Sequence, residues 1–298
     1  MSALALSVLL LAQAPAATSG TSGTAPGTEI RALTLTLLDN EGQEVADVSA
    51  ADVALLENGI HRDIASFQRD ARPLTVAILV DTSAAVSSSY RLNVVDAVVG
   101  VVARLPQGAR YSVWTTGDRP TKVVDYTDDR GAVGAALRRV APQGGNYTLD
   151  ALAEATVDLT KLAREGDRTA VVAVTGLGPE FSYRDKQRAA DEAEGRADLF
   201  LSVQIDGGGG DFDSRTRLSY ALERLARSSG GRDDQLLSYM AIDSALKKVS
   251  AHLASAYRLR YATVPELKKR TLELSVARPG TKVLIPQRSP GDGSRGER

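Results

Sequence analysis

The sequence of 298 residues contains no cysteine. Disulfides, thiolate-bound zinc, cysteine nucleophiles and lipid attachment through an N-terminal cysteine are therefore excluded. Histidine is scarce as well: His61 and His252 lie far apart in the sequence and leave little for a histidine-based zinc cluster. The sequence also lacks a G-x-S-x-G nucleophile elbow. We therefore interpret both histidines as structural or exposed rather than catalytic, and expect no enzyme activity.

An excess of charge of either sign is also absent. The chain has 36 basic and 37 acidic residues, a net charge of −1, so nothing indicates nucleic-acid binding or a polybasic membrane surface. A glycine run, 207–210, matches no phosphate-binding motif, and we expect no cofactor. Asp206, Asp211 and Asp213 around that run could hold Ca²⁺, but the spacing of known calcium loops is incomplete. We favour a loop at a strand end, with Asp213 or Ser214 capping the next helix.

Long hydrophobic runs are missing too. The apolar stretch Leu4–Leu11 is too short to span a bilayer, which takes about 20 residues. The small residues Ala12, Ala14, Ala16 and Ala17 follow it, which is typical of a signal peptide over 1–17. No Lys or Arg precedes the stretch, so an unstructured apolar start is the alternative. We expect an exported protein, periplasmic or extracellular, with no membrane span.

The flanking parts of the chain predict loops and β structure. Residues 18–29 have linker composition, and 288–298 form a polar tail that we expect to be disordered. Within 30–72, Leu33, Leu35 and Leu37 alternate with polar residues, and Asn58-Gly59 predicts a hairpin turn. Two further strands, 272–276 and 283–285, lie in 265–287 and should pack on this small flanking β unit.

Residues 73–264 show a different pattern. Thr75–Val80 is an unbroken apolar run, typical of a strand covered on both faces. A helix should follow, with Leu92, Val95, Val99 and Val102 on one stripe. Further strands and helices then alternate, which predicts an α/β fold with a doubly wound, mainly parallel sheet. The strands are 111–115, 122–126 at an edge, 170–175, 199–205 and 257–264; the helices are 149–164, 218–227 and 242–253.

The run TVAILVDTSAA, residues 75–85, resembles the first strand and loop of von Willebrand factor type A domains, which are Rossmann-like. The layout of 30–287 is similar to a bacterial subgroup of exported proteins related to that family. The segments that carry the similarity are 35–67, LERLARSSGGR at 222–232, YRLRY at 257–261 and VARPGTKV at 276–283. The resemblance implies a protein-binding domain.

In that family, five positions form a metal-ion-dependent adhesion site. Asp81 and Ser83 match the first two, but the second serine of the motif falls on Ala85. Asn146 takes the place of the family's threonine, with Thr148 two residues later, and Gly176 takes the place of the last aspartate. Because Mg²⁺ requires near-octahedral oxygen coordination, we expect no metal and only vestigial ligands at Asp81 and Ser83. A weak residual Mg²⁺ site is the alternative.

These features predict an exported, non-enzymatic module that binds or adheres to another protein without a metal. The contact should lie at the carboxyl edge of the sheet, where open α/β sheets bind ligands. Asp81, Ser83, Asn146 and Thr148 mark that edge. A structural or assembly component of a cell-envelope complex is the alternative function, and an enzyme with unrecognised residues is a third.

Overall fold

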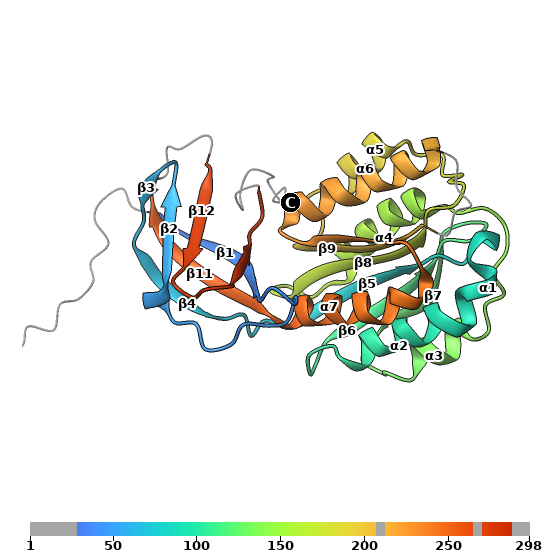
Figure 1. Ribbon diagram of the computed structural model, residues 1–298, viewed down its shortest axis with the longest axis horizontal. Helices are drawn as coiled ribbons and strands as arrows, with labels where there is room; N and C mark the ends of the chain where they lie inside the picture. The colour runs from blue at the N-terminus through green and yellow to red at the C-terminus, as the bar shows by residue number, and fades with distance from the viewer. Residues whose placement is uncertain (1–28, 207–211, 265–269, 288–298) are drawn as a thin grey trace, which may run out of the picture.

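The computed structural model describes residues 29–206, 212–264 and 270–287. The predicted signal peptide (1–17), nearly all of the linker, the glycine run and the tail lie outside these residues. The described chain has an α/β part and a smaller β part at one end, which confirms the predicted fold class (Figure 1). Within the described ranges, no helix combines the length and apolarity that crossing a membrane requires.

The α/β part is built on a six-stranded sheet in the order β10-β9-β8-β5-β6-β7. All neighbours are parallel except β7, which pairs antiparallel with β6. The edge position of β7 is the one predicted for 122–126. Every residue of β5 and β8 is buried, as the unbroken apolar runs predict. The strands are β5 (Leu74–Val80), β6 (Arg110–Thr115), β7 (Thr121–Thr127), β8 (Arg168–Gly176), β9 (Leu199–Ile205) and β10 (Arg232–Leu236).

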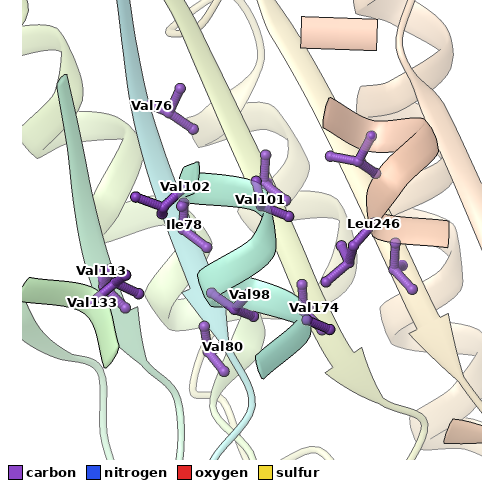
Figure 2. Close-up of a cluster of buried hydrophobic side chains, with 14 of the residues drawn as sticks. Val76, Ile78, Val80, Val98, Val101, Val102, Val113, Val133, Val174 and Leu246 are labelled. Atoms are coloured by element: carbon purple, nitrogen blue, oxygen red, sulfur yellow. The ribbon is translucent and has the colours of Figure 1, made fainter. Parts of the chain in front are cut away.

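Helices cover both faces of this sheet. On one face, α2 (Val95–Ala103), α3 (Ala132–Leu137) and α7 (Ile242–Ala254) share a core with Ile78 and its neighbours on β5 (Figure 2). On the other face, α4 (Thr148–Leu162), α5 (Lys186–Ala193) and α6 (Phe212–Ser229) pack around Leu79. Alternate residues of β5 therefore serve two separate cores, so the sheet is buried on both sides.

The stripe predicted for the first helix is wrong at Leu92, whose side chain is 81% exposed. The chain enters α2 through a 3-10 turn (Ala84–Val86), a short α1 (Ser87–Ser89) and a π turn (Tyr90–Val94). A π turn adds one residue to the helical ladder and rotates the positions before it. Tyr90 and Val94 therefore face the core in place of Leu92.

The β part is a sandwich of two antiparallel sheets, ordered β13-β1-β11-β4 and β12-β2-β3. Leu35, Leu55 and Leu259 are buried between them. Asn58 and Gly59 both have positive φ, 52° and 76°, and form the tight β2–β3 hairpin that the sequence predicts. The elements are β1 (Glu29–Leu38), a 3-10 turn (Ala50–Asp52), β2 (Val53–Glu57), β3 (Ile60–His61), β4 (Ile64–Arg69), β11 (Ala256–Thr263), β12 (Leu272–Val276) and β13 (Lys282–Leu284).

Two strands differ from expectation. The strand predicted at 257–264 is β11, and it pairs with β1 and β4 in the sandwich instead of ending the α/β sheet. Its apolar and charged residues alternate, which suits a sheet with one buried face and not a doubly covered one. The last place in the α/β sheet goes to β10 (RDDQL), which pairs only with β9. A mostly polar sequence is tolerated there because this is an edge strand.

A buried ion cluster ties the two sheets of the sandwich together. The side chain of Glu57 is 0% exposed, and its carboxylate lies 2.8 Å from Arg62 Nε and 3.0 Å from Arg270 Nε. The hydroxyl groups of Tyr261 and Thr263, on the opposite sheet, also donate to it. A buried carboxylate with this many partners is tolerated only while the whole set is intact.

We expect Glu57→Ala to lower the free energy of unfolding by about 3–5 kcal/mol, because it leaves two guanidinium groups without their counter-ion. Urea unfolding followed by circular dichroism measures this. The control is Asp96→Ala, which breaks an ion pair with Arg138 whose two side chains are 69% and 60% exposed. The control should be indistinguishable from wild type. Equal stability of both variants would contradict a structural role for the cluster.

Candidate functional site

The four residues predicted to mark the carboxyl edge lie together. Asp81 follows β5, Ser83 lies two residues on, Asn146 precedes α4, and Thr148 begins it. The amide of Asn146 connects them: Nδ2 lies 3.3 Å from Asp81 Oδ2, and Oδ1 accepts the Thr148 hydroxyl at 2.7 Å. All four residues are at least 98% buried, so none of these side chains is presented at the surface.

The Asp81 carboxylate is occupied by hydrogen bonds from within the chain. Its Oδ1 accepts the backbone N–H of Ser83 at 2.8 Å, and its Oδ2 accepts that of Gly176 at 2.9 Å. Burial raises the pKa of Asp81, and the backbone N–H groups of Ser83 and Gly176 act against that shift. The carboxylate thus joins the end of β5 to the end of β8.

Two threonines complete this network, and the sequence analysis missed both. The Thr116 hydroxyl, at the end of β6, donates to Asn146 Oδ1 at 2.7 Å. The Thr175 hydroxyl, in β8, accepts from Asn146 Nδ2 at 2.9 Å. Threonine is common in strands because it is β-branched, so its presence alone does not indicate a site. Only the position of these two residues at the ends of buried strands could have indicated a role at the carboxyl edge.

The residues present do not fit the adhesion-site metal. A Cβ atom on Gly176, where the family carries an aspartate, would lie 2.9 Å from the Tyr239 hydroxyl and 3.0 Å from Val86 Cγ1. A carboxylate side chain at that position would require Tyr239 and Val86 to move. Asn146 Oδ1 already accepts two hydroxyl groups, and Ala85 has no oxygen to offer. Among the described residues, no group of three or more His, Asp or Glu side chains could hold a metal.

A second carboxyl group, Glu180, lies in the loop after β8 and was also missed. Its side chain is 6% exposed, and Oε1 accepts the N–H groups of Ser182 at 3.2 Å and Leu149 at 3.5 Å. Glu180 therefore serves the N-terminus of α4, whose own N-cap residue, Tyr147, makes no side-chain cap. Burial outweighs these hydrogen bonds and raises the pKa of Glu180 to about 7.

The remaining candidates lie elsewhere. His61 is on the exposed hairpin strand β3, and His252 is buried on α7, where desolvation lowers its pKa to about 3. Asp213 is exposed in the first turn of α6, whereas Ser214 is already inside that helix. The predicted capping role of Asp213 or Ser214 is wrong, because α6 already begins at Phe212 and both residues lie inside it. The Ser214 hydroxyl instead accepts the N–H of Glu180 at 3.1 Å. Neither His61, on β3, nor His252, on α7, lies at the carboxyl edge of the sheet.

The middle of the chain matches a known family. Residues 76–179 match the family model described as von Willebrand factor type A domain. No curated protein sequence matches the chain.

Two solved proteins have a similar fold. One is described as von Willebrand factor type A from Catenulispora acidiphila, at 11% identity and a TM-score of 0.53 over 89% of this chain and 73% of that one. The other is proximal thread matrix protein 1 from the mussel byssus, at 17% identity and a TM-score of 0.52 over 66% of this chain and 50% of that one. A further structure of the mussel protein is described as having a zinc-occupied adhesion motif. Identities this low show the fold alone.

The Glu180 carboxyl group predicts a pH dependence of stability. Its pKa is about 7 in the folded protein against 4.5 in the unfolded chain, so the folded state holds the proton more tightly. The stabilisation is complete below pH 4.5 and is lost as the pH rises through 7. We expect Glu180→Gln to match wild type at pH 4.5 and to be more stable by about 3 kcal/mol at pH 8.

Urea unfolding of both proteins at the two pH values measures this difference. The lowered pKa of His252 has the opposite effect on the pH dependence of stability, but it is present in both proteins and cancels in the comparison. The exchange is well matched because Glu180 Oε2 has no hydrogen-bond partner among the described residues. A stability difference that does not change with pH would show that folding does not raise the pKa of Glu180.

Proposed function

The chain contains a von Willebrand factor type A domain, and from this premise we propose that the protein is an exported, non-enzymatic module that binds another protein without a metal ion. Domains of this family commonly mediate protein interactions. That general property suits the fold, but the contact surface has to be argued from this chain's own side chains.

One observation carries the proposal. Within the described ranges, five large apolar side chains are more than four-fifths exposed, and all five lie on segments that follow the carboxyl ends of the sheet strands. Exposed large apolar side chains at the edge where open α/β sheets bind ligands support an interaction site there. They are Leu92 at 81% after β5, Tyr183 at 92% after β8, Phe212 at 85% after β9, and Leu237 at 90% and Met240 at 88% after β10. We call these five residues the apolar edge.

In Figure 1, α1 lies at the end of the α/β part away from the β sandwich. Two observations support metal independence. The Asp81 carboxylate and the Asn146 side-chain oxygen already accept hydrogen bonds from the chain, and Tyr239 and Val86 lie close to Gly176. The mussel protein is described as holding zinc at its adhesion motif. Here the partner would instead be recognised by apolar and aromatic side chains.

Export is supported by the stretch Leu4–Leu11 and the small residues after it. The alternative, an assembly component that uses the β sandwich as its contact, has weaker support. The most exposed large apolar side chain described there is Ile60, at 58%. Both functions agree with export, so the contact surface is what distinguishes them.

The test uses the full chain with a C-terminal tag in its native host. Intact mass of the protein from the envelope and medium fractions should show loss of the first residues. Partners are then crosslinked in place and captured with and without a chelator. We expect Leu237→Asp with Met240→Asp to lose the partner, because two charges would be desolvated in the interface.

The matched control is Ile60→Asp, an equivalent change in the β sandwich, and it should keep the partner. Loss of the partner in the control alone would favour the assembly function. Loss of the partner upon chelation would contradict metal independence, and a full-length product confined to the cytosol would contradict export.

A further inference from the structure

A cleft with a volume of about 550 Å³ lies between the start of β12 and the end of β13. Its third wall is the end of α6, at Gly230 and Gly231. The cleft is as large as ordinary ligand sites in proteins. Leu272, Val283 and Ile285 line it, and all three also pack against the core of the β sandwich. Because β12 and β13 are both edge strands, the cleft borders that core where neither sheet continues.

One wall of the cleft is the free edge of β12. Among the described residues, this strand pairs with β2 alone. The N–H of Asn58, directly after β2, donates to the Thr271 carbonyl at 2.8 Å, so the backbone of Thr271 faces β2. Since successive residues of a strand direct their backbone groups to opposite sides, those of Leu272 and Leu274 point away from β2. A row of free N–H and C=O groups is a template for another strand.

The opposite wall is held in place by the end of α6. The N–H of Gln287 donates to the Ser228 carbonyl at 3.2 Å. A Cβ atom on Gly230 would lie 2.6 Å from the carbonyl carbon of Ile285, so the chain after β13 lies directly on this glycine. Gly230 also has a φ of 73°, which other residues rarely adopt. The cleft is therefore formed before a ligand arrives, which lowers the entropic cost of binding.

The charged groups of the cleft favour an acidic ligand. Arg227 and Arg270 line it, and none of its described lining residues is acidic. Arg270 is already held by Glu57 at 3.0 Å, and its side chain is only 6% exposed. The side chain of Arg227 is 58% exposed and pairs only with Glu223 in the described part of the chain. Because a guanidinium group has several N–H donors, Arg227 can meet a second carboxylate.

We propose that the cleft takes an extended, acidic segment of a partner protein, which adds a strand to the free edge of β12. The backbone groups of Leu272 and Leu274 fit an extended chain, because such a chain offers N–H and C=O groups at the same repeat. Its alternate apolar side chains would cover Val283 and Ile285, and a carboxylate between them would pair with Arg227. Strand addition at a sheet edge is a recurring way to bind peptides. This second contact goes beyond the proposed function, because it is separate from the apolar edge.

The test is isothermal titration calorimetry of the full chain with an acetylated octapeptide of alternating valine and glutamate. We expect saturable binding, and binding at least about tenfold weaker when lysine replaces glutamate. Two further versions carry methyl groups on the backbone nitrogens of the valines or of the glutamates. Only the nitrogens on one side of an extended strand can donate to β12. One methylated version should therefore lose binding, and the other should bind like the parent peptide.

Amide hydrogen exchange followed by NMR locates the peptide. The N–H groups of Glu273 and Ser275 face β2 and should exchange slowly with or without it. Those of Leu272 and Leu274 should exchange fast in the free protein and at least about tenfold more slowly in the complex. Because the expected change alternates along one strand, a general tightening of the protein would not reproduce it.

Arg227→Ala tests the charge, and it should weaken binding of the parent peptide by about threefold, as loss of an exposed ion pair does. The matched control is Arg188→Ala. Arg188 forms an equivalent pair with Glu192, one turn further along α5, and its side chain is 67% exposed. It is not among the described residues that line the cleft, so the control should bind like wild type.

No binding, equal binding of the two methylated peptides, or unchanged exchange at Leu272 and Leu274 would overturn the inference. Equal binding of Arg227→Ala and wild type, or tighter binding of the lysine peptide, would overturn the acidic character of the segment. A dimer of the free protein that pairs the β12 edges of two copies would overturn the inference as well. The proposed function fails separately, if the captured partner is insensitive to Leu237→Asp with Met240→Asp.

Discussion

The carboxyl edge of this protein depends on the buried carboxylate of Asp81. It lies where β5 ends and accepts the backbone N–H of Gly176, where β8 ends. Through Asn146 it is linked to Thr116 at the end of β6 and to Thr148 at the start of α4. A buried carboxylate is tolerated because N–H groups and amide hydrogens surround it. These donors and acceptors hold four segments of the chain together.

This internal network also explains how the edge can present aromatic side chains. Once α4 is fixed by Asn146 and Thr148, its first turn anchors the loop after β8 through Glu180, Ser182 and Asp150. Those residues take up the polar contacts of the loop, so Phe181 and Tyr183 are left to face outward. The surface chemistry of the domain thus follows from its buried polar groups.

Much of the fold could be predicted because burial on both faces leaves a clear mark in the sequence. Residues 76–80 and 170–174 are apolar without interruption, and the Asn58-Gly59 turn requires positive φ at both residues. The sheet to which 257–264 belongs could not be predicted, because an alternating strand fits either part of the molecule. The sequences of the edge strand β10 and of the π turn before α2 show no hydrophobic periodicity that would predict these elements. At the site, the absence of side-chain oxygens at Ala85 and Gly176 is visible in the sequence itself. The contacts of Glu180 and Tyr239 with this edge could not be predicted, because they join residues far apart in the sequence.

The central proposal is that hydrogen bonds within the chain occupy this edge in place of a metal ion. Thermal unfolding of the wild-type protein, with Mg²⁺, Mn²⁺ or Ca²⁺ and then with a chelator, tests it most directly. A metal that binds only the folded state, at 100 times its dissociation constant, would add about 2.7 kcal/mol of stability. The account predicts the same melting temperature under every condition. A rise with any of these ions that the chelator reverses, and that is lost in Asp81→Ala, would contradict it.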